Sequence, residues 1–260
     1  MTDFRPSSFQ ILPTIVKNLI IINVLCFAAQ FVLPRQGINV DDLFALHTWQ
    51  SDLFKPWQFI TYMFMHSTGD FSHIFFNMFA LWMFGSVLEN VWGPKRFLTF
   101  YIVCGLGAAL CHMLVLYFEN YQLIKEYNAI LTSDLGSSMQ RLQQFIQSHN
   151  LRDGSELSLP FANQIVRDHL DGATMGASGA VFGCLAAFGY LFPNDYLYVM
   201  GILPVKAKWL VIMYAAVELF SAIQNSAGDT VAHVAHLGGA LVGFLMVYFW
   251  NNTNRKKRIY

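Results

Sequence analysis

Long apolar segments alternate with polar connections along this chain, and six of them are long enough to form helices that cross a membrane. A spanning helix needs about 20 mostly apolar residues. The pattern predicts spans at residues 14–33, 73–92, 96–118, 176–193, 205–225 and 231–250. The fourth is short and rich in small residues, which favours a helix enclosed by other helices. We interpret the first segment as a retained helix rather than a signal peptide, because it lacks a small-residue cleavage site.

Two longer polar segments interrupt this pattern. Residues 34–72 are too long for a simple turn and contain Trp49 and Trp57, a residue type typical of membrane interfaces. Residues 119–172 form a polar insert in which apolar residues recur at helical spacing. These residues are Met139, Leu142, Phe145 and Ile146. We expect a small helical subdomain there; a disordered linker is less favoured, because the insert has no low-complexity sequence.

Composition agrees with a membrane protein. The chain is 55% hydrophobic and only 12% charged, whereas soluble domains carry about 25% charged residues, and the mean hydropathy is +0.41. The formal net charge is zero, so nothing indicates a nucleic-acid partner. All four cysteines fall inside apolar segments, which indicates small buried hydrophobes rather than a disulfide framework or a zinc site.

The distribution of basic residues predicts the orientation of the spans. Ten of the 16 basic residues flank the chain ends and the connections after spans two and four, and positive charge gathers on the cytoplasmic side. We therefore expect residues 1–13 and the basic tail 251–260 in the cytoplasm and the insert on the outer side. Spans two, four and six then run inward. A bacterial inner membrane is the simplest setting, and an organellar membrane is the alternative.

Polar groups recur at the outer ends of these three inward-running spans. His73 and Asn77 are four residues apart and share one helix face, about 6 Å apart along the axis. Ser178 lies in the sequence Gly-Ala-Ser-Gly at the start of the fourth span, and His236 lies near the start of the sixth. Such groups usually face a bundle interior or a water-filled cavity. We expect all four at a similar depth.

These residue types suit nucleophilic catalysis. A serine hydroxyl needs a neighbouring base, and an imidazole such as that of His236 is the natural one. Attack on a carbonyl creates an oxyanion, for which His73, Asn77 and the backbone N–H of Ser178 are candidate donors. A helix N-terminus adds partial positive charge. Glu218 could orient a histidine or make a structural hydrogen bond, and no carboxylate is clearly placed as a third triad member.

Each part taken alone has a structural alternative. Small residues at four-residue spacing are usual helix-packing devices in membranes, and this chain has Gly179 with Gly183 and Gly239 with Gly243. A lone intramembrane histidine is more often a buried hydrogen-bonding group than a base. We interpret His112 and His233 in that way, with the alternative that His233 lines the cavity. We interpret His66 as a residue that orders the outer loop. Only the combination of serine, two histidines and asparagine at matched depth is specific.

That combination resembles the rhomboid family of intramembrane serine proteases. The matching stretches are HIFFN (73–77), LENVWG (88–93), GASGAVFG (176–183) and AHLGGALVG (235–243). The resemblance covers roughly residues 14–250 without the insert. It implies an all-α, six-transmembrane-helix bundle with a dyad of Ser178 and His236 and with oxyanion donors His73 and Asn77. It also implies transmembrane protein substrates in the lipid bilayer, and no metal or other cofactor.

The resemblance assigns roles to further residues. Phe182 matches an aromatic position that packs on the base, and Glu89 with Gly93 matches an element that ties down the inner end of span two. The supporting glycines are Gly176, Gly179, Gly239 and Gly243. The chain departs from the family pattern at Trp57-Gln58, where many members have Trp-Arg. It also departs in the length of its insert and in two extra residues between His66 and His73.

We therefore expect an intramembrane serine endopeptidase. The alternative is a catalytically silent rhomboid-like protein that binds membrane clients, which would tolerate loss of Ser178 or His236; both are present. A transporter or channel is less favoured, because spans two, four and six become apolar inward of the polar groups. The sequence indicates neither the oligomeric state nor the identity of the substrate.

Overall fold

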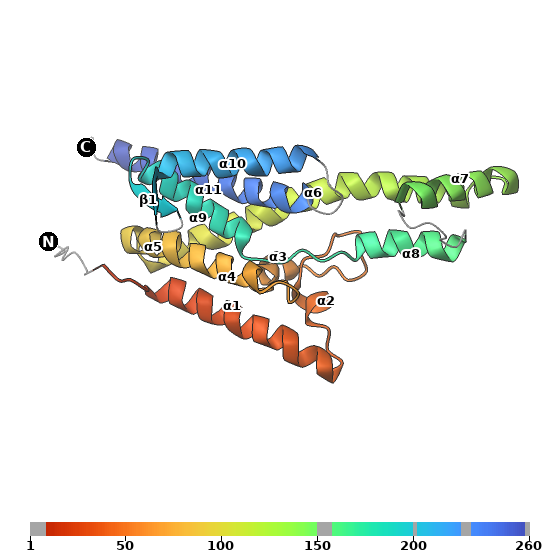
Figure 1. The fold of residues 1–260 in the computed structure, drawn as a ribbon, viewed down its shortest axis with the longest axis horizontal. Coiled ribbons are helices and arrows are strands. Elements are labelled where there is room, and N and C mark those ends of the chain that lie inside the picture. The colour runs from red at the N-terminus through yellow and green to blue at the C-terminus, as the bar shows by residue number, and fades with distance from the viewer. Residues whose placement is uncertain (1–8, 150–157, 200–201, 225–229, 258–260) are drawn as a thin grey trace.

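A computed structural model describes residues 9–149, 158–199, 202–224 and 230–257 (Figure 1). The expected N-terminal segment 1–13 and basic tail 251–260 lie partly outside these residues. A helical stretch stands at each predicted span. In chain order these are α1 (Thr14–Val32), α4 (Phe71–Ala80) continued by the π-helical turn Leu81–Gly85 and α5 (Ser86–Trp92), α6 (Pro94–Leu131), α9 (Ser178–Leu191), α10 (Ala207–Gln224) and α11 (Thr230–Lys257).

Four segments among the described residues are long and apolar enough to cross a membrane. They are Thr14–Gln36, Phe71–Trp92, Pro94–Leu131 and His233–Asn252. Helix α9 is apolar but shorter, and ten of its 14 residues are buried, as expected for a helix enclosed by protein. The predicted all-α membrane protein is confirmed at this level, and the count of six spans stays a prediction.

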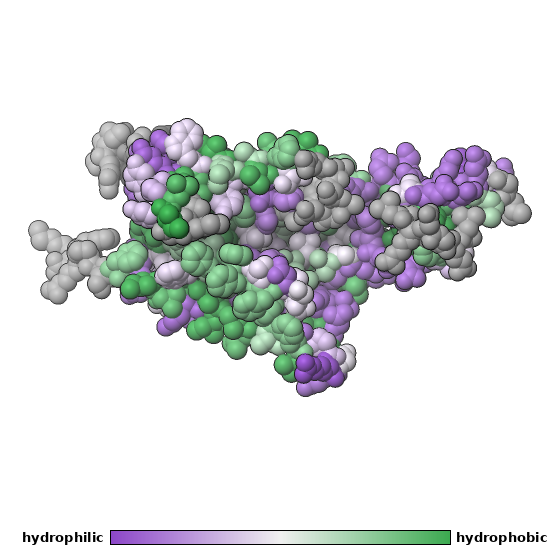
Figure 2. Space-filling model, in the orientation of Figure 1, coloured by the Kyte–Doolittle hydropathy of each residue, from purple (hydrophilic) through white to green (hydrophobic). Residues whose placement is uncertain are grey.

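The molecule is elongated along the direction of its long helices (Figure 1). The start of α1 and the end of α11 lie at one end, and α7 (Leu135–His149) and α8 (Leu159–Leu170) project at the other. Apolar side chains cover α1 and α4 in the middle of the molecule, whereas polar side chains surround α7 and α8 (Figure 2). Phe76 of α4 and Phe220 of α10 are each more than 60% exposed. This middle surface fits contact with lipid.

Two features of the connections differ from expectation. Helix α6 runs well past the predicted end of its span at residue 118, so the insert begins inside a helix. A two-stranded antiparallel hairpin joins α9 to α10; its strands β1 (Tyr196–Val199) and β2 (Leu203–Lys206) pair Tyr196 with Lys206. The segment between α1 and α4 contains only short turns of helix. These are Leu33–Gln36, α2 (Val40–Phe44), α3 (Gln58–Thr61) and Tyr62–Phe64.

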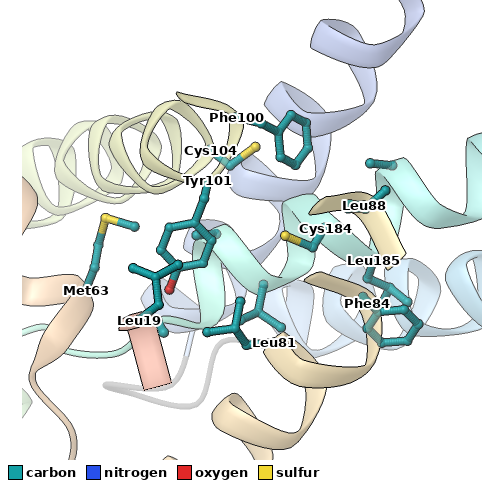
Figure 3. Packing of buried hydrophobic residues seen from close by; sticks show 14 of the residues in the cluster. Leu19, Met63, Leu81, Phe84, Leu88, Phe100, Tyr101, Cys104, Cys184 and Leu185 are labelled. Atoms are coloured by element: carbon teal, nitrogen blue, oxygen red, sulfur yellow. The ribbon is translucent and has the colours of Figure 1, made fainter. Parts of the chain in front are cut away.

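The main core lies where α6, α9 and the stretch from α4 to α5 meet (Figure 3). Tyr101 and Cys104 of α6 are fully buried there, as is Cys184 of α9. The four cysteines are free thiols; Cys104 and Cys184 are buried as predicted, whereas Cys26 and Cys111 are only partly buried. A separate apolar cluster joins the end of α6 to α7 and α8, and comprises Leu123, Ile130, Leu142, Phe145, Ile146, Ala162 and Val166. Of the four residues that suggested a helix there, Met139 alone is exposed.

Local capping sets where the second helical stretch begins and ends. The Asp70 carboxylate accepts hydrogen bonds from the backbone N–H and the hydroxyl of Ser72 at 2.9 and 2.7 Å, which caps α4. These hydrogen bonds lower the pKa of Asp70. At the other end, Gly93 has a φ of +80°, which favours glycine, and separates α5 from α6. The cap at Asp70 places His73 and Asn77 in the first two turns of α4.

Candidate active site

Ser178 and His236 face each other although 58 residues separate them in the chain. Ser178 is the first residue of α9, and His236 lies two turns into α11. The distance between Ser178 Oγ and His236 Nε2 is 2.8 Å, a hydrogen-bond length. The pair therefore has the contact that a serine nucleophile and its general base require.

Glycines bring α9 and α11 into backbone contact beside this pair. A Cβ atom added to Gly239 would overlap the carbonyl oxygen of Gly179, and one added to Gly243 would lie 2.7 Å from the Cα of Gly183. Both spacings are shorter than non-bonded heavy atoms tolerate. These glycines thus serve helix packing, as the sequence indicated, and the packing holds the two helices at the separation that the serine–histidine contact needs.

An aromatic ring fixes the plane of the histidine. Phe182, one turn after Ser178, stacks on His236 with ring centroids 4.4 Å apart and planes at 4°. The ring of Tyr214 on α10 meets Phe182 edge-on at 6.3 Å. The contact between Phe182 and His236 agrees with the position implied by the family resemblance.

His73 lies next to the serine and presents a donor toward it. Its Nδ1 accepts the backbone N–H of Ser67 at 3.2 Å, so the ring proton of a neutral imidazole sits on Nε2. A Cβ added to Gly176 would lie 3.0 Å from His73 Nε2 and 3.6 Å from Ser178 Oγ. Gly176 has a φ of +134°, and its missing side chain keeps the space between these two groups open.

Asn77 lies one turn further along α4 and is buried. Its Nδ2 donates to the backbone carbonyl of His73 at 2.8 Å, within the same helix. A carboxamide nitrogen carries two protons, so the second N–H is not used in that bond. The structure thus brings His73, Ser178 and His236 together and shows Asn77 in a bond that supports the histidine's own helix.

A carboxylate adjoins the pair on the side away from the serine. Glu218 of α10 is buried, and its Oε2 lies 3.1 Å from His236 Nδ1 and 2.5 Å from His233 Nδ1. The sequence placed no carboxylate clearly in this position. The available signal was an acid inside an apolar span, which is costly unless it is paired. Pairing with Glu218 agrees with the interpretation of His233 as a hydrogen-bonding group, although its side chain is only partly buried.

The same three residues could hold a metal ion. Glu218, His233 and His236 each offer a ligand atom, and these atoms lie within 4.8 Å of one another, the one such group among the described residues. Two imidazoles and a carboxylate form a common zinc ligand set. That catalysis needs no metal ion therefore stays a prediction, and treatment with a chelator can test it.

Glu89 is a structural residue at the opposite end of the bundle. Its carboxylate accepts the backbone N–H groups of Ile15 and Val16, both at 2.9 Å. These N–H groups belong to the first turn of α1 and have no partner within that helix. Glu89 therefore ties α5 to the start of α1, in agreement with the role that the resemblance implies.

Gln58 organises the outer loop where many family members have arginine. It is fully buried. Its Oε1 accepts the backbone N–H groups of His47 and Lys55 at 3.3 and 3.0 Å. Its Nε2 donates to the backbone carbonyls of Asp42 and Leu53 at 3.1 and 3.0 Å. A neutral carboxamide thus joins three parts of the loop, and the departure from arginine leaves the loop well anchored.

His66 lies at the inner edge of this loop, as the sequence indicated. Gln30 exchanges two hydrogen bonds with the backbone of His66, at 2.9 and 3.0 Å. The ring is fully buried, with its centroid 5.1 Å from that of His73, and neither ring nitrogen has a hydrogen-bond partner. Burial and the neighbouring His73 lower the pKa of His66 to about 4. The ring is therefore neutral at physiological pH.

Comparisons with known proteins show which family the chain belongs to. A family model for the Rhomboid domain matches residues 53–131 and 153–252. The chain is 26% identical over 192 residues to Rhomboid protein 1, mitochondrial, of Saccharomyces cerevisiae, which covers 74% of this chain and 42% of the yeast protein. It is 27% identical over 241 residues to Rhomboid protease AarA of Providencia stuartii, covering 88% and 69%.

A third relative is Rhomboid protease GluP of Bacillus subtilis, 22% identical over 237 residues, which covers 89% of this chain and 34% of that protein. This chain thus spans less than half the length of the yeast and Bacillus proteins. Two relatives carry the name protease, which supports protease activity at the level of the family. The matched regions contain both Ser178 and His236 and cover more than half of the sequence, and the chain therefore belongs to the rhomboid family.

Proposed function

We propose that this protein is an intramembrane serine endopeptidase that cleaves transmembrane protein substrates with Ser178 as nucleophile and His236 as general base. The observation that carries this proposal is the 2.8 Å contact between Ser178 Oγ and His236 Nε2 in a member of the rhomboid family. Two separate helices supply the pair, and a stacked Phe182 holds the imidazole in place.

The reaction begins with transfer of the Ser178 hydroxyl proton to His236 Nε2 as the oxygen attacks a peptide carbonyl. The protonated imidazole then gives this proton to the leaving amine. The acyl group stays on Ser178 until water, deprotonated by the same nitrogen, hydrolyses the ester. Each proton that His236 takes up is returned within one cycle, so the pair is regenerated.

The oxyanion formed on attack needs donors aimed at it. The Nε2–H of His73 faces the space beside Gly176 and Ser178, and the backbone N–H of Ser178 belongs to the first turn of α9. The partial positive charge of this helix end favours an anion there. Asn77 supplies a further amide donor from the same face of α4. Gly176 keeps the space open for the substrate carbonyl.

The substrate segment is a membrane helix that unwinds locally. An intact helix uses its carbonyls in its own hydrogen bonds, so helix-breaking residues near the cut bond favour cleavage. We expect a small residue at that bond, because glycines line the site. The six helical stretches then form a six-span domain at 14–250, with the site open to the outer side and both termini cytoplasmic.

The polar end of the molecule supports this orientation. Helices α7 and α8 and their own apolar cluster project beyond the apolar middle, opposite the start of α1 (Figures 1 and 2). The insert 119–172 is then an outer-side subdomain. A bacterial inner membrane remains the simplest setting from the charge balance, although the yeast relative carries the name mitochondrial.

Labelling with a fluorophosphonate probe in detergent tests the proposal. Wild type should be labelled, whereas Ser178→Ala and His236→Ala should not, and all three should elute as folded protein of the same size. Cleavage of a model transmembrane substrate in liposomes should follow the same order. If a folded wild type neither reacts nor cleaves, the catalytically silent alternative replaces this proposal, and client binding becomes the assay.

A further inference from the structure

Glu218 stands where the histidine of a serine–histidine pair needs a third group. It projects from α10 toward α11, and its Oε2 lies 3.1 Å from His236 Nδ1 on the side of the ring opposite Ser178. His236 Nδ1 is buried and has no aligned hydrogen-bond partner. The nearby carboxylate is thus within contact distance of a ring nitrogen that lacks an aligned partner.

Two histidines share this carboxylate oxygen. His233 Nδ1 lies 2.5 Å from the same Oε2, one helical turn before His236 on α11. A carboxylate oxygen has two lone pairs and can accept both contacts. His233 thus holds Glu218 against α11, which directs the carboxylate toward the catalytic ring. An acid on a membrane helix is retained at a cost of several kcal/mol without such partners.

The carboxylate decides which nitrogen of His236 is free to act as a base. A carboxylate accepts hydrogen bonds and cannot donate one, so its contact with Nδ1 is attractive only when Nδ1 carries the proton. Nε2 is then the unprotonated nitrogen, and it faces the Ser178 hydroxyl at 2.8 Å. The opposite tautomer would put a lone pair against the carboxylate and an N–H against the nucleophile.

We propose that Glu218 is a positioning residue that extends the Ser178–His236 pair to a Ser–His–Glu arrangement. This inference rests on the proposed protease function. When Nε2 takes the serine proton, the imidazole becomes a cation and Nδ1 keeps its own proton. The carboxylate stays ionised and stabilises this cation through the Nδ1–H contact. Glu218 touches neither the substrate nor the reacting atoms and acts only through His236.

The test compares Glu218→Gln, Glu218→Asp and a matched control, Glu126→Gln, in steady-state cleavage of a transmembrane substrate. Glu126 is an acid on α6 whose side chain is 54% exposed. Glu218→Gln should lower kcat by about 10²- to 10⁴-fold with little change in KM, as removal of the triad charge does elsewhere. Glu218→Asp should restore part of kcat, and the control should match wild type.

A double variant separates positioning from simple structural support. In a His236→Ala background, Glu218→Gln should change the residual rate by less than about twofold, because its effect passes through the missing ring. A structural role would lower both backgrounds alike. If Glu218→Gln keeps kcat within about threefold of an active wild type, the inference is wrong while the protease function stands. If wild type itself reacts with neither the probe nor the substrate, the proposed protease function is refuted, and the inference about Glu218 is refuted with it.

A measurement on unmodified protein covers the case in which Glu218 variants do not fold. The ¹⁵N spectrum of the histidine rings at neutral pH reports which nitrogen of His236 carries the proton, and the signal is assigned by its loss in His236→Ala. Protonation at Nδ1 is expected. Protonation at Nε2 would overturn the inference, because in that tautomer the catalytic ring offers no donor to the carboxylate and the serine has no base.

Discussion

The two hydrogen bonds that Glu89 accepts from the start of α1 make a quantitative prediction about stability. Replacing Glu89 with alanine leaves the N–H groups of Ile15 and Val16 without partners. An unsatisfied buried donor costs about 1–3 kcal/mol. Val16 is fully buried, so its N–H should contribute this whole range, whereas the N–H of Ile15 is only partly buried and should contribute about half. The sum is about 1.5–4.5 kcal/mol.

Unfolding of the purified protein in mixed micelles by titration with sodium dodecyl sulfate measures this loss. The neighbouring Asn90→Ala is the matched control, because Asn90 also bonds the segment before α1, through Gln10, but at an exposed site. The control should stay within about 0.5 kcal/mol of wild type. If Glu89→Ala behaves like the control, the carboxylate does not hold α1 in place and the reasoning is refuted.

Four further predictions follow from the site and its surroundings. His73→Ala should lower kcat by about 10²- to 10³-fold. Asn77→Ala should lower kcat by less, because one N–H of the Asn77 amide is used in a hydrogen bond within α4. If His73→Ala cleaves with the kcat of wild type, His73 does not belong to the oxyanion site. Gly239→Ala should destabilise the fold by about 1–3 kcal/mol or more in the same micelle titration, since its Cβ would overlap the carbonyl of Gly179; unchanged stability would contradict the backbone contact. Folding lowers the pKa of His66 from 6.5 to about 4, so between these pH values the unfolded chain binds a proton that the folded chain does not. The free energy of unfolding should therefore decrease as the pH is lowered from 6.5 to about 4, by up to about 1.4 kcal/mol per pH unit. His66→Phe should remove this part of the pH dependence, and an unchanged pH dependence would argue against the assignment. Finally, EDTA should leave fluorophosphonate labelling unchanged. If EDTA abolishes labelling and zinc restores it, the reaction needs a metal ion, for which Glu218, His233 and His236 are the candidate ligands.

The sequence predicted the helical stretches and most of the site because each leaves a strong periodic or chemical signal. Apolar runs of membrane length mark the long helices, and the polar groups at their outer ends stand out against an apolar background. The packing role of Gly239 and Gly243 could be expected from their spacing alone. The register of α9 against α11 then follows from these glycines, and it places Ser178 opposite His236.

Other features leave no comparable signal. The hairpin at 196–206 is short, and strands of four residues carry little periodicity. The sequence did not show that α6 continues as a helix after its apolar run stops, supported by contacts with α7 and α8. The position of Glu218 depends on the rotation of α10 about its axis, which is set by tertiary packing and not by local sequence. Gln58 likewise shows its anchoring role only once the loop is folded around it.

The glycine contact between α9 and α11 has a consequence for how the protein can move. Helices in backbone contact at these glycines cannot approach further. The spacing of nucleophile and base is then as rigid as the two main chains and is independent of bilayer thickness. Motions that admit a substrate must then take place in segments outside this glycine contact. The glycine contact thus sets a constant distance between α9 and α11 while the surrounding parts of the protein can change shape. We expect substitutions to be tolerated less at these glycines than at the residues around them.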